Sequence, residues 1–241
     1  MAGTTERAAG SDLLQTLDRG LRVLGLLRGS AHGLTVGEVA QRLVIHRSIA
    51  SRLLATLAWH HMVTRSDDGR YRLGTAILEY ARAVLPHLRD IALPELRRLT
   101  DALGVTAHLS VAEGGECVAV AVVEPQQSDV HVAYRVGSRH PLAVAAGGLA
   151  ILAGRPPLPG EPEEVAEARR RGFATSRSRL QPGAVGISAP ITAPGVSASV
   201  GVIFFAENAA EHAEHAVLDA ARAIGAALGR DDRQPGRQGR P

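Results

Sequence analysis

The sequence predicts an α+β protein in two parts, a helical N-terminal part and a C-terminal part built on a mainly antiparallel sheet. Three observations predict it: apolar residues recur at helical spacing up to residue 62, an Asp-Gly turn then separates two short β-like segments, and alternating or wholly apolar runs dominate from residue 105 onward. Helices that flank an antiparallel sheet define this fold class. With 241 residues, 45% of them hydrophobic, the chain is long enough for two small domains.

Three helices are predicted in the N-terminal part. Apolar residues at helical spacing over 17–27 define the first helix, which ends at Gly29. The second begins at Thr35, because Thr35 and Glu38 have the spacing of a capping box in which the Thr35 side chain accepts the Glu38 N–H. The third helix, over 47–62, has one apolar stripe and one polar face. That polar face consists of Arg47, Ser48, Ser51, Arg52 and Thr56.

A β-hairpin and a linker helix follow. Residues 63–65 and 70–73 are short β-like runs around an Asp-Gly turn, which is a hairpin signal. Three helices followed by a hairpin make a winged helix-turn-helix. Apolar residues over 77–88 then predict an amphipathic helix, broken near its end by Pro86. Its apolar stripe either packs on the protein's own body or forms a surface for dimerisation.

The C-terminal part is predicted to place helices around one sheet. A helix begins at Pro94, a residue favoured in a first turn, and ends at a Gly104 cap. Beyond it, alternating or continuous apolar runs predict strands, and small-residue or polar segments predict helices. The expected strands are 105–111, 117–123, 130–136, 173–177, 184–191 and 200–205, and the expected helices are 142–153, 163–171 and 209–228.

These elements divide the chain into five segments. We expect a disordered arm at 1–13, a winged helix-turn-helix domain at 14–74, a linker helix at 75–90, a sheet domain at 91–228 and a disordered tail at 229–241. No window reaches the ~18 consecutive apolar residues needed to cross a bilayer, and the N-terminus has no apolar signal core. The sequence therefore predicts a cytoplasmic protein without a membrane partner.

No metal or cofactor is expected. Cys117 is the single cysteine, so it cannot form an internal disulfide or, alone, a Cys-based zinc site. His212 and His215 lie one turn apart beside two glutamates, and we interpret them as part of a polar helix face. All 27 basic residues are arginine, which excludes a Schiff-base or P-loop lysine.

The charge distribution indicates nucleic-acid contact through the N-terminal part. The net charge is +3, but basic residues exceed acidic ones at 1–74 and 230–241, whereas acidic residues exceed basic ones between. A basic head on a mildly acidic body is typical of a DNA-binding protein, although a solvated basic surface has the same composition.

The polar face of the third helix has the chemistry of a recognition helix. Arg52 is the residue expected to read a base, because a guanidinium can bond guanine O6 and N7 together. Short side chains beside it, such as Ser48 and Ser51, let a helix sink into the major groove. Other polar residues are expected to fix the register by contacting phosphates. These are Arg19, Thr35, Arg47, Arg65 and Arg70.

Five segments resemble one family. The run 34–54, LTVGEVAQRLVIHRSIASRLL, resembles the helix-turn-helix of the isocitrate lyase regulator (IclR) family of bacterial transcriptional regulators, and 71–74, YRLG, resembles the end of its wing. In the second part, 136–142, 148–153 and 186–191 also resemble family motifs, so the resemblance spans about 14–228. It implies a GAF-like effector-binding domain behind the winged helix-turn-helix, a homodimer or tetramer, and a double-stranded DNA operator whose binding a small-molecule effector modulates.

The resemblance also implies where the effector binds. The matching segments are 137–150, 186–190 and 197–201, and their side chains are mostly small and apolar, which leaves room for a ligand. We expect a small, partly apolar metabolite such as an amino acid or an aromatic acid. The alternative is that the domain only dimerises and that DNA binding needs no ligand. The effector-binding candidates are Leu142, Ala143, Ala146, Gly147, Gly186, Ile187, Ser188 and Ser199.

An enzyme with a DNA-binding appendage is the competing class of protein. Cys117 would be its nucleophile, with His108 or His131 as the base. However, Cys117 lies in an apolar run, where a cysteine usually behaves as a small hydrophobic residue with a raised pKa. We therefore expect no enzymatic activity.

Overall fold

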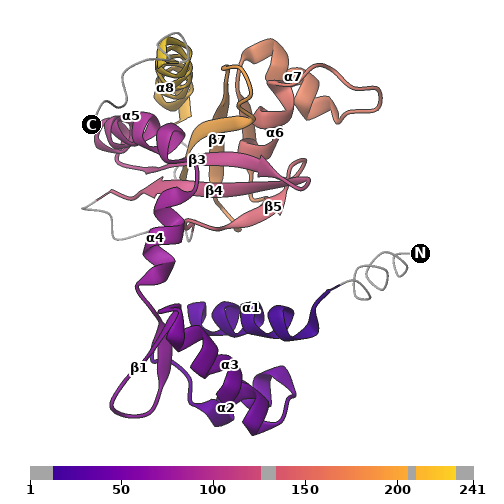
Figure 1. The fold of residues 1–241 in the computed structure, drawn as a ribbon. Helices are drawn as coiled ribbons and strands as arrows, with labels where there is room; N and C mark the ends of the chain where they lie inside the picture. The colour runs from indigo at the N-terminus through magenta and orange to yellow at the C-terminus, as the bar shows by residue number, and fades with distance from the viewer. Residues whose placement is uncertain (1–12, 126–133, 206–209, 232–241) are drawn as a thin grey trace. The chain divides into compact units, whose positions relative to one another are not determined.

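The computed structural model describes residues 13–125, 134–205 and 210–231. The chain divides into two compact units, Met1–Val84 (unit 1) and Leu85–Pro241 (unit 2) (Figure 1). Most of the arm expected at 1–13 and of the tail expected at 229–241 lies outside the described residues, and the described start of the tail is still helical. No helix within the described residues combines the length and the apolar character that crossing a membrane requires.

Unit 1 contains the three helices and the hairpin expected for it. Val23, Val39 and Leu54, one from each of the first three helices, are buried in a common apolar core. The two strands pair antiparallel, and a bridge between Leu34 and Tyr71 attaches the hairpin to the segment before the second helix. The elements are α1 (Gln15–Arg28), α2 (Val36–Leu43), α3 (Arg47–Trp59), β1 (Val63–Arg65), β2 (Tyr71–Leu73) and α4 (Ala76–Ala83).

The turn between α2 and α3 depends on a valine in a left-handed conformation. Val44 caps α2 with φ 54° and ψ 50°, and its side chain is 90% exposed. Its N–H donates to the carbonyls of Ala40 and Gln41, which closes the end of the helix. A β-branched residue in this region crowds its Cβ against the backbone, at a cost of about 1–2 kcal/mol. The packing of α2 on α3 therefore holds a strained residue in place.

Replacing Val44 by glycine is expected to stabilise unit 1 by about 1 kcal/mol, because glycine adopts positive φ without this crowding and the lost side chain buries almost nothing. Urea denaturation of the two proteins measures the difference. Val84 is a matched control, since it is also an exposed C-cap valine but has φ −81°. Val84→Gly should destabilise the protein, and a loss of stability in Val44→Gly would show that the turn is not strained.

The helices on either side of residue 85 differ from the prediction. Instead of one helix broken at Pro86 and a second beginning at Pro94, α4 ends at Ala83 and α5 (Pro86–Leu103) runs through Pro94. Pro86 is tolerated at the start of α5, where its missing N–H would have no helical partner. Pro94 removes one hydrogen bond in the interior, and the buried face of α5 offsets this loss. That face consists of Leu88, Ala92, Leu96 and Leu99.

Within the described residues, the sheet of unit 2 has six antiparallel strands, in the order β5-β4-β3-β8-β7-β6. The strands are β3 (Thr106–Glu113), β4 (Glu116–Val123), β5 (Arg139–Pro141), β6 (Ala174–Arg177), β7 (Val185–Ile191) and β8 (Ala198–Phe204). The remaining helices are α6 (Ala146–Ala153), α7 (Glu163–Arg171) and α8 (Ala210–Asp231).

Two predicted elements near β5 are corrected. The strand expected at 130–136 lies mostly outside the described residues, and its described end is not a strand, because Gly137 and Ser138 take the hydrogen bonds of Ala119 on β4. The helix expected at 142–153 begins only at Ala146. Residues 142–144 form a turn instead, and the Leu142 N–H donates to Gly115 O, at the turn between β3 and β4.

The two faces of the sheet have different characters. Side chains alternate along a strand, so neighbours point to opposite faces. Leu109, Ile187 and Val200 pack with α5 and α8 in the large apolar core, whereas the neighbouring Ser188 and Ser199 belong to the other face. Helix α6 covers that second face, with α7 beside it (Figure 1). We call the surface between the sheet and α6 the polar face.

Candidate functional site

The exposed side of α3 brings together five of the nine residues predicted to contact DNA, and the other four, Arg19, Thr35, Arg65 and Arg70, lie outside this helix. Ala50, Leu53 and Leu54 are buried in the core of unit 1, so the opposite side of the helix faces solvent. That side carries Arg47, Ser48, Ser51, Arg52 and Thr56, and also Trp59, which was not among the predicted DNA contacts.

Neighbouring groups already hold two of these side chains. Ser48 is fixed to the N-cap of α3, because the His46 Nδ1 lies 2.8 Å from Ser48 Oγ and accepts the Ser48 N–H at 3.3 Å. Thr56 donates its hydroxyl to Arg52 O at 3.0 Å. By contrast, Arg47 and Arg52 make no ion pair with any described residue. Both guanidinium groups are therefore available to an anionic partner.

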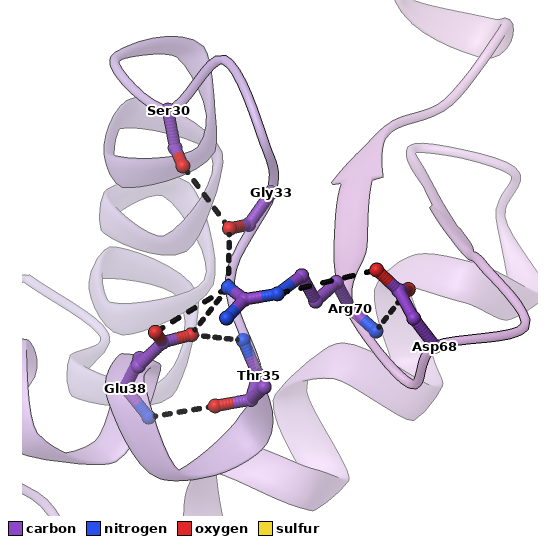
Figure 2. A network of polar contacts seen from close by, with 6 residues as sticks. All are labelled: Ser30, Gly33, Thr35, Glu38, Asp68 and Arg70. Atoms are coloured by element: carbon purple, nitrogen blue, oxygen red, sulfur yellow. Dashed lines mark hydrogen bonds and ion pairs between the residues drawn. The ribbon is translucent and has the colours of Figure 1, made fainter.

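Arg70 joins the wing to the start of α2 (Figure 2). Its Nη1 donates to Gly33 O at 3.1 Å and to Glu38 Oε2 at 3.0 Å. The predicted capping box is confirmed: Thr35 N donates to Glu38 Oε2 at 2.7 Å, and Glu38 N donates to Thr35 Oγ1 at 3.3 Å. Thr35 and Arg70 thus fix the wing within unit 1, and their contacts with phosphate stay predictions.

Glu38 makes the stability of this network depend on pH. The Thr35 backbone N–H, then the Thr35 hydroxyl and Arg70, lower the pKa of Glu38 below its ordinary 4.5. A carboxyl with a lowered pKa in the folded state stabilises that state above its unfolded pKa, and the contribution disappears as the pH falls through the folded pKa.

Glu38→Gln is therefore expected to lower Tm by a few degrees at neutral pH, and the two proteins should converge only as the pH falls below the lowered pKa of the folded state, where the wild-type carboxyl is also uncharged. Thermal melts across this pH range measure the effect. Glu79→Gln, at an exposed glutamate of α4, is the matched control and should not alter the profile. A constant offset between wild type and Glu38→Gln at all pH values would contradict the role of the charge.

Buried hydroxyl and imidazole groups line the polar face. His108 and Ser110 lie on β3, and the His108 Nδ1 is 3.1 Å from Ser110 Oγ. That hydroxyl is 3.4 Å from the Tyr134 OH, and the His108 and Tyr134 rings meet edge to face with centroids 4.9 Å apart. Ser199 on β8 donates to Gly147 O at 2.9 Å, which holds α6 directly on the sheet.

The side chains of His108, Cys117 and Tyr134 are uncharged near pH 7. Burial, with a smaller contribution from His140, lowers the pKa of His108 to about 4. Burial raises the pKa of Cys117 to about 11 and that of Tyr134 to about 12. The polar face therefore offers hydrogen bonds without charge from these three side chains, and a protonated Cys117 is a poor nucleophile.

Several effector-binding candidates lie on the polar face. A Cβ at Gly147 would lie 3.3 Å from Cys117 Sγ, and one at Gly186 would lie 3.4 Å from the Ala146 Cβ. Ser188 Oγ is fully buried, and no described group hydrogen bonds to it.

The remaining candidates are placed differently. The Ile187 side chain packs against α5 and α8 in the apolar core, so it does not lie on the polar face. Ala143 is exposed, and Leu142 packs with Ile151 and with Cys117 of the polar face. Three residues on or beside the polar face were not among the candidates predicted from the sequence, although a polar residue within an apolar strand, such as Ser110, was a usable signal. They are Ser110, Tyr134 and Ser176.

The histidines of α8 are exposed. His212 and His215 face solvent on the helix. In the part of the chain that the structure describes, no group of three or more His, Cys, Asp or Glu side chains is arranged to hold a metal ion.

Comparison with known proteins gives two family matches and several relatives. A model described as the IclR helix-turn-helix domain matches residues 16–67, and one described as the bacterial transcriptional regulator IclR C-terminal domain matches residues 82–158. The HTH-type transcriptional regulator BhcR of Paracoccus denitrificans is 28% identical over 242 residues, which is 88% of this chain and 86% of BhcR.

Two solved structures have the same fold over nearly the whole chain. The IclR of Thermotoga maritima matches with a TM-score of 0.73 and 26% identity, over 90% of this chain and 100% of that one. An IclR homolog from Microbacterium hydrocarbonoxydans, complexed with 4-hydroxybenzoate, matches with a TM-score of 0.78 and 26% identity, over 88% of this chain and 98% of that one.

Proposed function

The chain belongs to the IclR family of DNA-binding transcriptional regulators, and we propose that it binds an operator as a homo-oligomer whose affinity for DNA is modulated by a small molecule held on the polar face. The observation that carries the proposal is the exposed side of α3, where Arg47 and Arg52 make no ion pair with any described residue. Such a regulator works in the cytoplasm and needs no catalytic activity.

On this proposal, α3 lies in the major groove. Arg52 reads a guanine, and Ser51 lets the helix approach the bases. Arg19, Arg47 and Arg65 contact phosphates on either side. One helix-turn-helix makes too few contacts for tight binding, so two copies reading two half-sites are required.

On this proposal, the polar face binds a partly apolar ligand that carries a hydroxyl, amine or carboxyl group. The unpaired Ser188 Oγ is a ready hydrogen-bonding group there. Arg139 on β5 is exposed and paired with Glu113 and Glu116, so a carboxylate would rely on backbone N–H and hydroxyl groups. A relative binds 4-hydroxybenzoate, which places aromatic acids first among the classes to test, followed by amino acids.

A mobility-shift assay tests the DNA-binding half of the proposal. The probes are intergenic DNA next to the protein's own gene and a scrambled duplex of the same composition, each at several salt concentrations. We expect the intergenic fragment to bind more tightly at physiological salt. Equal affinity for both duplexes would contradict a sequence-specific regulator.

A thermal-shift measurement with aromatic acids and amino acids tests the sensor half, because a ligand that binds the folded state raises Tm with its occupancy. Ser188→Ala is the informative variant. Since Ser188 Oγ has no partner among the described residues, its removal should leave Tm without ligand unchanged and reduce the ligand-induced shift. If no metabolite class shifts Tm, the sensor half of the proposal fails and the DNA-binding half is untouched.

A further inference from the structure

The single tryptophan of the chain, Trp59, lies on the exposed side of α3 at the C-terminal end of the helix. Trp59 is 81% exposed, although a tryptophan buries more apolar area than most residues when it is covered. Ser48, Arg52, Ala55 and Trp59 follow each other at intervals of three or four residues, so they form one row along the helix. No described residue accepts a hydrogen bond from the Trp59 indole N–H.

The row changes character along α3. Ser48 and Ala55 are small, and Arg52 is long and flexible, so the first part of the helix can approach another surface closely. Trp59 is the first large rigid side chain after Arg52. Its ring would keep the C-terminal end of α3 farther from any surface that the helix approaches.

Helix geometry places this end at the rim of the major groove. Arg47 and Trp59 are separated by about 18 Å along the axis at 1.5 Å per residue. The major groove is about 12 Å wide, and the N-terminal residues of a recognition helix enter it. When Arg47 and Arg52 occupy the groove, Trp59 lies at or beyond its edge, where the sugar-phosphate backbone runs.

The chemistry of Trp59 fits that backbone. The C-terminal end of a helix carries a partial negative charge, which disfavours a phosphate there unless a side chain supplies a donor. The indole provides an N–H donor and a flat apolar ring that can cover a sugar. The two unpaired arginines on the same side of α3 favour a polyanion over an uncharged protein surface as the occupant.

Resting on the proposed function, we infer that Trp59 is a further DNA contact, in which the ring packs on the sugar-phosphate backbone at the groove edge and the indole N–H donates to a phosphate oxygen. It contributes affinity and register rather than sequence preference, because the backbone is the same at every base pair. Trp59 also makes the protein's own fluorescence a direct probe of its DNA interface.

Two readouts on one titration test this inference. Fluorescein-labelled intergenic and scrambled duplexes report binding by anisotropy, while Trp59 emission and its quenching by acrylamide report whether the indole becomes covered. We expect the Trp59 indole to become covered when either duplex binds. Trp59→Ala should weaken binding to both duplexes by a similar factor, about tenfold, and Trp59→Phe, which keeps the ring but loses the N–H, by a smaller one.

The matched control moves the tryptophan to unit 2. In a Trp59→Phe background, Leu158→Trp places the only indole on a loop residue that is 65% exposed, and its emission should not respond to DNA. Binding by anisotropy without a change at Trp59 would overturn the inference and leave the proposed function intact. A response of Trp59 to protein concentration but not to DNA would assign this surface to a second copy. No anisotropy change with either duplex would contradict DNA binding itself.

Discussion

Leu78→Asp combined with Val84→Asp is expected to convert the protein to a monomer and to weaken operator binding by about a hundredfold or more, since one copy would then read only one half-site. Both side chains lie on or at the end of α4 and are exposed, at 66% and 51%. Tyr80 adds to the same exposed apolar surface, which the proposed homo-oligomer would cover. A carboxylate buried there without a partner would be strongly unfavourable.

Light scattering measures the mass, and anisotropy on the intergenic duplex measures the affinity. The matched control is Glu79→Ala with Arg82→Ala, which alters the same helix but removes no apolar surface. Both double variants should keep the wild-type melting curve when diluted, because exposed residues are changed. An unchanged mass in the aspartate variant, with the fold intact, would rule out α4 as the interface.

Arg52→Ala is expected to cost about 1–3 kcal/mol on the intergenic duplex and to relax the preference at one base pair, because a bidentate contact with guanine is lost. Binding to scrambled duplexes should change much less. Arg47→Ala provides the comparison on the same helix: it should weaken binding to all duplexes alike and reduce the salt dependence, as expected of a phosphate contact. Equal losses on both duplexes for Arg52→Ala would remove its base-reading role.

The elements of unit 1 could be predicted from the sequence because local signals define them. The capping box of Thr35 and Glu38 sets the start of α2, and the Asp-Gly turn sets the hairpin. The network around Arg70 could not be predicted, since it joins residues more than thirty positions apart. Trp59 was missed because its exposure depends on which side of α3 the core covers.

Unit 2 was less predictable because tertiary contacts override its local signals. Pro94 marks a helix start by its type, yet the buried leucines on either side of it keep α5 continuous. The polar face depends on strand register: Ile187 and Ser188 are neighbours in sequence but reach opposite faces. The small residues at Gly147 and Gly186 predicted room for a ligand, but in the structure α6 packs closely on the sheet at both positions. The partners of His108 became evident only in the folded sheet.

The two-faced sheet has an evolutionary consequence. In β7 and β8, each residue that supports the fold from the α5 and α8 side stands beside one that faces α6, as Ile187 does beside Ser188 and Val200 beside Ser199. On the proposed function, mutations at the second set would change which molecule is recognised while the large core keeps the domain folded. Ligand specificity can therefore change one residue at a time during evolution, because each intermediate variant keeps the core that folds the domain.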